Sequence, residues 1–197
     1  MHIYLMRHGQ TDWNIVHRMQ GRSDIPLNAT GLKQARAAAH GMDELPIDRI
    51  LTSPLRRARQ TAQAVAAGRG VPVLVEDDII EMAFGELEGQ LLSDFPACEC
   101  IFSDPEHYVP LEGGETYAQL DARCKKLLEE ILPPLEGRFH DVVLVSHGAF
   151  IRGVVRRVLD LPLKDFWSAP PQPNCSCTVL ELTDGVCTLV EEGRVYG

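Results

Sequence analysis

At 197 residues, the chain is long enough to fold as one domain that buries about 70% of the surface of its unfolded state. Its apolar content of 45% and charged content of 24% are typical of a globular protein. The formal net charge of −9 argues against a general basic surface for nucleic acid or an anionic membrane, so a bound anion would need a local cluster of arginine and histidine.

The start of the chain carries no basic leader, and its first apolar run is too short for a signal peptide. No run in the sequence approaches the ~20 apolar residues that are needed to cross a bilayer. We therefore expect a cytoplasmic protein that binds no membrane. The oligomeric state is not decided by the sequence, and a homodimer stays open.

The first predicted element is a short buried strand over residues 2–6, in which branched and aromatic residues run up to His8. The same pattern returns late in the chain, where a strand over residues 142–145 runs up to His147. Ligands of open α/β sheets bind beyond the carboxyl ends of the strands. The two histidines are therefore predicted to share one pocket.

The polar stretch 12–24 is expected to form a loop without a helix. A helix then opens at Thr30, its expected N-cap, and ends before Pro46. A strand over residues 49–52 leads to a second helix, which we expect to begin at Ser53-Pro54 because proline at the first helical position loses no needed N–H.

Three arginines crowd the first turn of that second helix: Arg56, Arg57 and Arg59. Cations at this position oppose the helix macrodipole, whose positive end prefers anions. In an acidic protein the crowding suggests that at least one arginine faces a bound anion while the others are exposed. The residues alone do not settle which one.

The second half of the chain alternates in the same way. The remaining elements are expected as strands over 71–75 and 142–145, helices from Thr116 to Pro133 and after Gly148, a proline-rich connection over 162–173, and a hairpin of 177–182 with 186–190. We find no repeat and no second core. The pattern predicts a single domain over residues 1–197 with a three-layer α/β/α sandwich.

The six cysteines include two Cys-x-Cys pairs, Cys98 with Cys100 and Cys175 with Cys177. Zinc sites usually have spacers of two to four residues, so these pairs are weak candidates for metal ligands. We interpret them as free thiols in a reducing compartment and predict no metal site.

His8 and His147 admit three interpretations: metal ligands, buried structural histidines, or an acid–base or nucleophilic pair. Arg7 adjoins His8, and Arg57 is a candidate for the same crevice. Guanidinium groups are permanently charged, so they disfavour a metal dication and favour a phosphate. The combination favours phosphoryl chemistry without a metal or other cofactor.

In that chemistry His8 is the nucleophile. Neighbouring cations lower the pKa of an imidazole, so His8 is expected to be neutral and able to attack phosphorus, which gives a phosphohistidine. Arg7, Arg57 and His147 can stabilise the charge on the transferring phosphoryl oxygens.

The departing alkoxide needs a proton, and a carboxylic acid with a raised pKa is the usual donor. Glu81 follows two isoleucines, a setting in which burial could raise its pKa. Asp77 and Asp78 are alternatives that the residues alone do not exclude.

These motifs resemble the histidine phosphatase superfamily, in the branch that also holds the cofactor-dependent phosphoglycerate mutases. The matching pieces stand in the family order: Arg7-His8-Gly9-Gln10-Thr11-x-Trp13-Asn14, Gln20-Gly21-x-x-Asp24-x-Pro26-Leu27, Gly31-x-x-Gln34-Ala35, Ser53-x-Leu55-x-Arg57-Ala58-x-x-Thr61-Ala62, Glu81-x-x-Phe84-Gly85-x-x-Glu88-Gly89, Gly114-Glu115-Thr116 and Ser146-His147-Gly148. A single Arg-His-Gly is a weak signal, but seven ordered pieces over residues 3–153 are highly specific.

The resemblance implies a role for each matching residue. It makes His8 the phosphorylated nucleophile, Glu81 the proton donor and acceptor, and Arg7, Arg57 and His147 the phosphate pocket. Residues Asn14, Gly21 and Gly148 are implied on the substrate side. The implied fold is the phosphoglycerate mutase-like sandwich with a mainly parallel sheet, and the implied partner is a small-molecule phosphate monoester.

The charge of one segment favours hydrolysis over mutase transfer. Residues 82–122 contain no Lys or Arg and nine carboxylates, and a lid over the pocket is expected at about 82–114. A second anionic group on the substrate would be repelled there, so we expect an ester with a neutral or cationic remainder, contacted by His107 or Tyr108. Candidate substrates are α-ribazole phosphate and sugar phosphates.

Three alternatives remain. The chain could be a phosphoglycerate mutase-type enzyme, a catalytically silent module that binds a phospho-ligand, or a zinc hydrolase. Silent relatives usually lose one of the two histidines or the acid, and this chain keeps all three.

Overall fold

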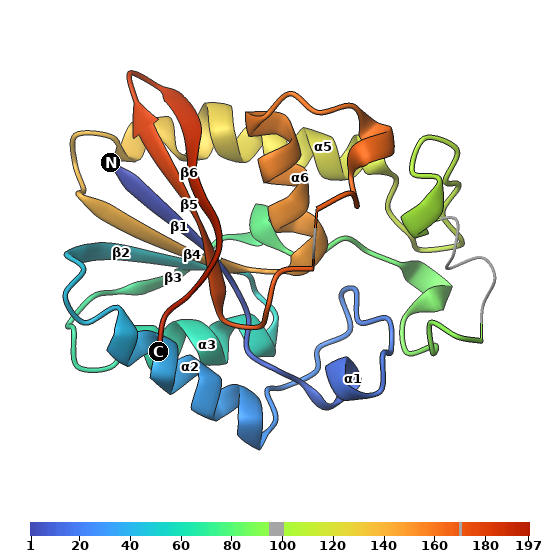
Figure 1. The fold of residues 1–197 in the computed structure, drawn as a ribbon, viewed down its shortest axis with the longest axis horizontal. Coiled ribbons are helices and arrows are strands. Elements are labelled where there is room, and N and C mark those ends of the chain that lie inside the picture. The colour runs from blue at the N-terminus through green and yellow to red at the C-terminus, as the bar shows by residue number, and fades with distance from the viewer. Residues whose placement is uncertain (95–100, 170) are drawn as a thin grey trace.

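The computed structural model describes residues 1–94, 101–169 and 171–197. Its centre is a six-stranded sheet in the order β3-β2-β4-β1-β5-β6 (Figure 1). The strands are β1 (His2–Arg7), β2 (Ile47–Thr52), β3 (Val73–Val75), β4 (Asp141–Ser146), β5 (Ser176–Thr183) and β6 (Val186–Val195). The first four are mutually parallel, and β5 pairs antiparallel with both β1 and β6. The expected mainly parallel sheet is confirmed.

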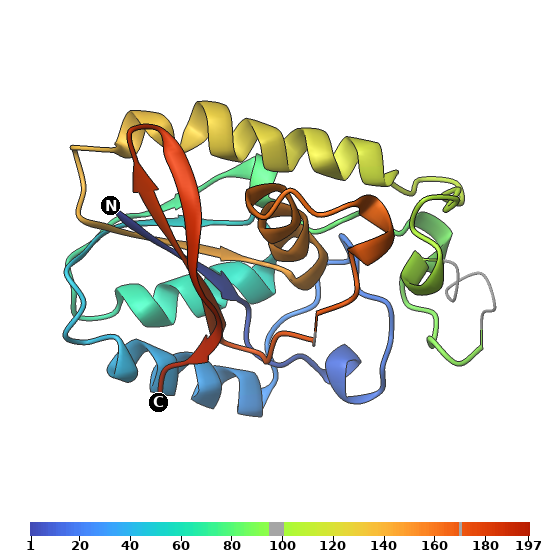
Figure 2. The ribbon, with the colours of Figure 1, turned by 45° about the horizontal axis from the view of Figure 1, so that its top comes forward.

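Helices cover both faces of this sheet, which confirms the three-layer sandwich. The helices are α1 (Asp12–Ile15), α2 (Ala29–Gly41), α3 (Arg56–Ala66), α5 (Tyr117–Lys126) and α6 (Gly148–Val158). Figures 1 and 2 show α2 and α3 on one side and α5 and α6 on the other. The extent of a single domain over residues 1–197 stays a prediction.

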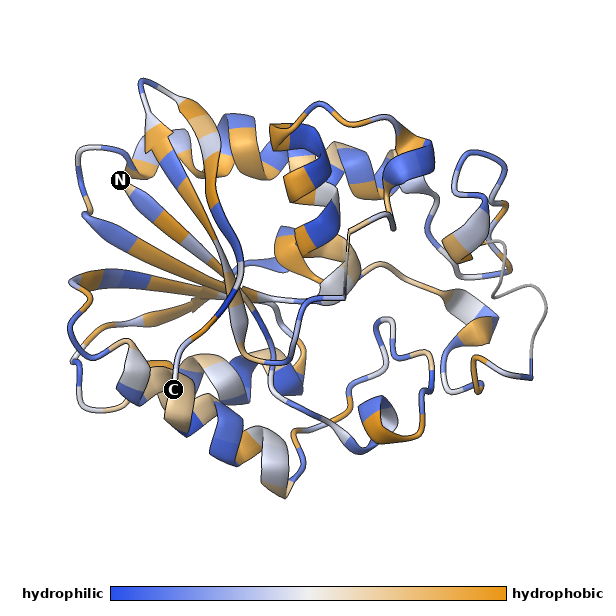
Figure 3. Cartoon of the chain, in the orientation of Figure 1, coloured by the Kyte–Doolittle hydropathy of each residue, from blue (hydrophilic) through white to orange (hydrophobic). Residues whose placement is uncertain are grey.

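Alternation along the central strands divides the apolar residues between two cores. Ile3 and Leu5 of β1 pack toward α5 and α6, whereas Tyr4 and Met6 pack toward α2 and α3. All six residues of β4 are buried, as expected of a central strand covered on both faces. Figure 3 shows this apolar band along the strands, with more polar stripes on the outer sides of the helices.

Two predicted helix starts are wrong by a few residues. The N-cap of α2 is Asn28, whose side chain accepts a hydrogen bond from the Gly31 N–H at 2.8 Å, so the helix begins before Thr30. Helix α3 begins at Arg56, with Leu55 at its N-cap in extended conformation. Ser53 does not open this helix, because its N–H donates to the Val145 carbonyl and extends the sheet pairing instead.

Other elements differ less. The stretch expected to lack a helix holds the four-residue α1, which is stabilised by a capping box between Thr11 and Asn14. Strand β3 is shorter than the predicted 71–75. Helix α5 begins directly after its N-cap Thr116, close to the expected start, and the chain continues from α5 into a π-helical segment, Leu127–Ile131.

The terminal hairpin is confirmed. Strands β5 and β6 flank Asp184-Gly185, and both residues have positive φ (51° and 76°), as a two-residue hairpin turn requires.

Within the described residues, no helix is long and apolar enough to span a bilayer. The cytoplasmic location stays a prediction. Cys175 and Cys177 are buried free thiols, and Cys98 and Cys100 lie outside the described residues.

Candidate active site

The two histidines meet because their strands are neighbours. Strands β1 and β4 are parallel and in register, with Arg7 opposite Ser146, so His8 and His147 follow adjacent carboxyl ends. The centroids of the two imidazole rings lie 5.2 Å apart. The expected shared site is therefore formed at this edge of the sheet.

The surroundings of His8 determine which ring nitrogen is available. Its Nδ1 lies 2.7 Å from the Gly9 carbonyl, which can only accept, so Nδ1 carries the hydrogen in the neutral ring. Its Nε2 accepts a hydrogen bond from Arg57 Nε at 3.2 Å. Burial lowers the pKa of His8 well below its usual value, and the charges of Arg57 and Arg7 lower it further. His8 thus presents a neutral Nε2 lone pair.

Of the three arginines in the first turn of α3, Arg57 points into the protein. It is fully buried, whereas Arg56 and Arg59 are exposed. Its Nη1 donates to the Ser23 carbonyl at 2.7 Å and its Nη2 to the Gly21 carbonyl at 2.6 Å. Burial lowers the pKa of Arg57 to about 10, which still leaves it charged at neutral pH.

The loop that holds Arg57 depends on a glycine. Gly21 has φ of +50°, and a Cβ at this position would lie 2.2 Å from Glu88 Oε1. Glu88 accepts hydrogen bonds from the Arg22 N–H and the Ser23 hydroxyl, both at 2.8 Å. Gly21 therefore allows the close approach of Glu88, which fixes the two carbonyls that orient Arg57.

Two buried side-chain nitrogen atoms in the site lack hydrogen-bond partners among the described residues. Arg7 donates from Nη1 to the Gln172 carbonyl at 2.5 Å, but its Nε has no hydrogen-bond partner among the described residues. His147 Nε2 lies 2.7 Å from Ser53 Oγ, and His147 Nδ1 is likewise without a partner in the described part of the chain. Buried polar atoms are normally paired, so both atoms fit a site that receives an anion.

The carboxylate of Glu81 lies beside the N-terminal end of α6. Its carboxylate accepts hydrogen bonds from the N–H groups of Met82, Ala149 and Phe150 at 2.9, 3.3 and 3.0 Å. Its side chain is buried, but backbone donors surround its oxygens in place of the apolar setting expected from the preceding isoleucines.

Asp77 and Asp78 do not line the cavity that Glu81 lines. Asp77 is exposed, and Asp78 pairs with Lys126 at 2.6 Å. The structure thus separates the three carboxylates that the residues alone left as alternatives.

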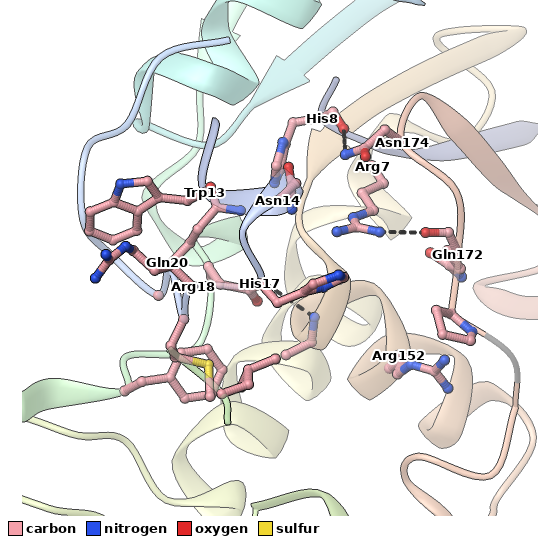
Figure 4. Close-up of a pocket in the computed structure, with 18 of the residues that line it drawn as sticks. Arg7, His8, Trp13, Asn14, His17, Arg18, Gln20, Arg152, Gln172 and Asn174 are labelled. Carbon is pink, nitrogen blue, oxygen red and sulfur yellow. Dashed lines mark hydrogen bonds between the residues drawn. The ribbon is translucent and has the colours of Figure 1, made fainter. Parts of the chain in front are cut away.

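The remaining predicted residues border the same cavity. The side-chain oxygen Oδ1 of Asn14 accepts a hydrogen bond from the Thr11 N–H at 3.0 Å, so the amide nitrogen of Asn14 faces away from Thr11. Gly148 is the first residue of α6, and the nearest atom to an added Cβ would be Arg7 Nε at 3.9 Å. Figure 4 shows Arg7, His8 and Asn14 close together at one end of the cavity.

The cavity has a volume of about 680 Å³, far more than a phosphoryl group needs. Its outer walls are formed mainly by apolar and aromatic side chains: Trp13, Met19, Phe84, Leu92, Phe102 and Trp167. Arg18 and Arg152 also line it, on opposite sides in Figure 4. The described parts of the expected lid thus contribute apolar residues to its wall.

The residues that line the cavity differ from the acidic lining that the sequence predicts. Glu81 is the single carboxylate among its described lining residues, although segment 82–122 is acidic. His107 and Tyr108 do not line it, because His107 pairs with Asp104 on the surface and Tyr108 packs against Tyr117. The premise for a neutral or cationic substrate remainder therefore fails for the described residues.

Sequence reasoning missed several contributors. Ser53 reaches His147, Asn174 Nδ2 donates to the His8 carbonyl at 2.9 Å, and Gln172 receives Arg7. Gln172 belongs to the proline-rich connection and Asn174 follows it, and this connection has no hydrophobic periodicity that would predict an element. Ser53 was mistaken for a helix start, so only its polarity in a buried stretch could have indicated a contact.

Across residues 1–94, 101–169 and 171–197, no three His, Cys, Asp or Glu side chains lie close enough together to hold a metal ion.

Comparisons with known proteins agree with this geometry. The family model of the histidine phosphatase superfamily (branch 1) matches residues 3–193. A probable phosphoglycerate mutase of Serratia proteamaculans is 34% identical over 168 residues, covering 82% of this chain and 76% of that protein. Phosphoserine phosphatase 1 of Hydrogenobacter thermophilus is 34% identical over 170 residues, covering 84% and 80%. The solved structure of Bacillus stearothermophilus YhfR is 30% identical with a TM-score of 0.91, covering 98% and 97%.

Proposed function

Because the chain belongs to the histidine phosphatase superfamily, we propose that it is a metal-independent phosphomonoester hydrolase that works through a phosphohistidine on His8. The observation that carries the proposal is the pair of unpartnered buried nitrogen atoms, Arg7 Nε and His147 Nδ1, beside the neutral His8. A phosphoryl group would give both donors acceptors and the imidazole an electrophile.

In the first step, His8 Nε2 attacks phosphorus, the N–P bond forms and the ester P–O bond breaks. Arg57 exchanges its hydrogen bond to His8 for one to a phosphoryl oxygen. His147 donates from Nδ1 when the Ser53 hydroxyl donates to its Nε2. Glu81 gives its proton to the leaving alkoxide.

In the second step, water attacks the phosphohistidine. Glu81 takes a proton from the water, the N–P bond breaks, and inorganic phosphate leaves with His8 neutral again. The backbone carbonyl of Gly9 keeps the hydrogen on Nδ1 through both steps, so the same nitrogen is ready for the next ester.

The cavity beyond the phosphate end supports a proposal about the substrate. Its aromatic walls suit an apolar body, and Arg18 and Arg152 suit a second anionic group on a small metabolite phosphate. Phosphoserine, which the relative from Hydrogenobacter is named for, carries such a group. Neutral candidates such as a sugar phosphate or α-ribazole phosphate remain substrates to be compared directly.

The test replaces His8 by alanine. Wild-type protein in a chelator should hydrolyse 4-nitrophenyl phosphate and carry an acid-labile phosphate after rapid quenching, whereas His8→Ala should do neither. Arg59→Ala, an exposed arginine of α3, serves as a control that should behave as wild type. Labelling of the His8→Ala protein would refute the nucleophile, and loss of activity in chelator would favour a zinc hydrolase.

The labelled protein also distinguishes hydrolysis from mutase transfer. A phosphatase should lose its label to water as inorganic phosphate without any acceptor. A label that persists until a phosphoglycerate is added would favour the mutase-type alternative. Stable binding of a phosphate ester without labelling would indicate a silent binding module.

A further inference from the structure

Glu81 lies in a segment outside the central sheet, which reaches this segment through the Ser146 hydroxyl of β4, a donor to the Ile79 carbonyl at 2.7 Å. The described chain on either side of Glu81 forms short 3-10 turns at Asp77–Ile79 and Gly85–Leu87 and an isolated bridge between Phe84 and Gly114. The side chain of Glu81 is oriented by N–H groups, but its own backbone needs other partners to stay in place. Side chains from distant parts of the chain supply them.

The centre of this arrangement is the buried side chain of Glu115, which is 7% exposed. Arg123 of α5 donates from Nε to Glu115 Oε1 and from Nη2 to Oε2, both at 2.8 Å. Arg22 Nη2 donates to Glu115 Oε2 at 3.3 Å. One carboxylate therefore holds two guanidinium groups, one of them in a two-point contact that fixes its plane.

Both guanidinium groups reach the backbone beside the acid. Arg22 Nε donates to the Glu81 carbonyl at 3.1 Å. Arg123 Nη1 donates to the carbonyls of Asp78 and Ile80 at 2.7 and 2.8 Å. The carbonyl groups on the N-terminal side of Glu81 and of Glu81 itself are thus fixed by the two arginines.

Glu115 itself fixes the C-terminal side. The Ala83 N–H donates to Glu115 Oε2 at 3.3 Å, and the Glu115 N–H donates to the Ala83 carbonyl at 2.8 Å. Arg123 also lies over the ring of Phe150, 5.2 Å from its centroid, and the Phe150 N–H is one of the donors to the Glu81 carboxylate. The same network therefore touches the acid and one of the groups that orient it.

We propose that Glu115, Arg123 and Arg22 are positioning residues that hold the Glu81 carboxyl in line with the leaving oxygen of the ester. This rests on the proposed function, in which Glu81 donates the proton. The network touches no substrate, because its members bind the backbone on either side of Glu81 and do not line the cavity. A proton donor acts only when its oxygen is within hydrogen-bond reach of the leaving group, so a shift of this segment weakens proton donation selectively.

The experiment compares two esters of similar size and different leaving groups. 4-Nitrophenyl phosphate releases a stable phenolate that needs little protonation, whereas benzyl phosphate releases an alkoxide that needs the proton. Glu115→Gln and Arg22→Gln should each lower kcat/KM, which reports the step that breaks the ester bond, by about tenfold more for benzyl phosphate than for 4-nitrophenyl phosphate, part of the 10²–10⁴-fold that a general acid contributes. Glu81→Gln should show the same split, only larger.

The matched control is Asp121→Asn, which removes ion pairs from α5 to Arg156 and Arg157 of α6 without touching residues 78–83. Asp121→Asn should not lower the rate for one ester more than the rate for the other. Arg22 is 39% exposed in its side chain, so Arg22→Gln keeps the test available should Glu115→Gln fail to fold. Equal losses on both esters, or no loss, in the Arg22 variant would refute the positioning role.

Failure of the proposed function is visible separately in the same assay. The proposed hydrolase itself would be overturned if the wild-type protein hydrolysed neither ester, or if His8→Ala hydrolysed the esters as fast as the wild type does. A wild-type protein that depends on His8 but shows no leaving-group split in the Glu115 and Arg22 variants would overturn only the network.

Discussion

His8 is made available by neighbours that its own sequence motif only partly contains. Gly9 fixes the hydrogen on Nδ1, and the guanidinium of Arg57 reaches Nε2 across 49 positions of sequence. Arg57 in turn is oriented by the carbonyls of Gly21 and Ser23. The proposed nucleophile and the cation beside it are thus held as one unit, in which the proposed phosphoryl group would replace a single hydrogen bond.

Arg152 tests the proposed second anionic group at the residue scale. Its side chain is 7% exposed, lies against Trp167 and lines the cavity on α6. Arg152→Gln should lower kcat/KM for 4-carboxyphenyl phosphate by about tenfold, the equivalent of about 1.4 kcal/mol for a lost charge-assisted hydrogen bond. Hydrolysis of phenyl phosphate should change by no more than about twofold, because the neutral ring makes no such bond.

Arg156→Gln on the same helix is the control, since Arg156 pairs with Asp121 and does not line this cavity. Two results would count against the anionic group: a wild-type protein that prefers phenyl phosphate, or an Arg152 variant in which the activity toward both substrates falls equally.

At the scale of elements, tertiary contacts overrode two local signals. Ser53-Pro54 has the composition of a helix start, yet Ser53 completes the pairing with β4 and its hydroxyl oxygen lies 2.7 Å from His147 Nε2. The helix therefore begins later, at Arg56. By contrast, the helix start at Thr116, which a capping box stabilises, and the Asp184-Gly185 turn depend on contacts within a few residues of sequence, and the predicted helix start and hairpin are confirmed.

The contact between α5 and α6 depends on a glycine. A Cβ at Gly153 would lie 2.7 Å from the Sγ of buried Cys124. Gly153→Ala should therefore destabilise the protein by about 1–2 kcal/mol, since overpacking outweighs the gain in helix propensity of about 1 kcal/mol. The free energy of unfolding in urea measures the effect.

Cys124→Ala removes the atom that the new methyl group would meet. The double variant should therefore be more stable than the sum of the two single changes implies. Strict additivity, or a Gly153→Ala protein as stable as wild type, would show that the two helices separate without cost.

At the scale of the whole molecule, the active-site histidines couple stability to pH. Burial and neighbouring cations lower the pKa of His8 and of His147 well below 6.5. The folded protein thus keeps both neutral while the unfolded chain binds protons near pH 6.5. Unfolding takes up protons below that pH, so stability is fully present above it and falls as the pH decreases.

Each histidine should contribute a slope of about 1.4 kcal/mol per pH unit between pH 6.5 and the lowered pKa. Urea unfolding at pH 7.5, 6.5 and 5.5 measures the slope, which should be smaller in His147→Gln than in wild type. His40→Gln is the control, because His40 is exposed on the surface. Equal slopes in the two variants would show that His147 binds its proton as easily in the folded protein.

His107 acts in the opposite direction, because its carboxylate neighbour Asp104 raises its pKa. Its stabilisation would be present below pH 6.5 and lost as the pH rises, but the pair is fully exposed and a surface pair contributes little. The buried histidines should therefore set the sign of the pH dependence.

Local chemistry allowed the sequence by itself to determine the alternating elements, the strand ends that carry His8 and His147, the start of α5 near Thr116 and the terminal hairpin. Each of these depends on hydrophobic period, capping or turn residues that lie close together in the chain. The resemblance added Arg57 and Glu81, which periodicity could not separate from their neighbours.

Only the tertiary structure decided which side chains line the cavity. Segment 82–122 is acidic in sequence, yet its described carboxylates point elsewhere, and the cations Arg18 and Arg152 come from other elements. The contacts of Glu115 with Arg22 and of Ser53 with His147 likewise join residues far apart in the chain. Composition records how much charge a segment carries, whereas the direction of each side chain is set by packing against residues far away in sequence.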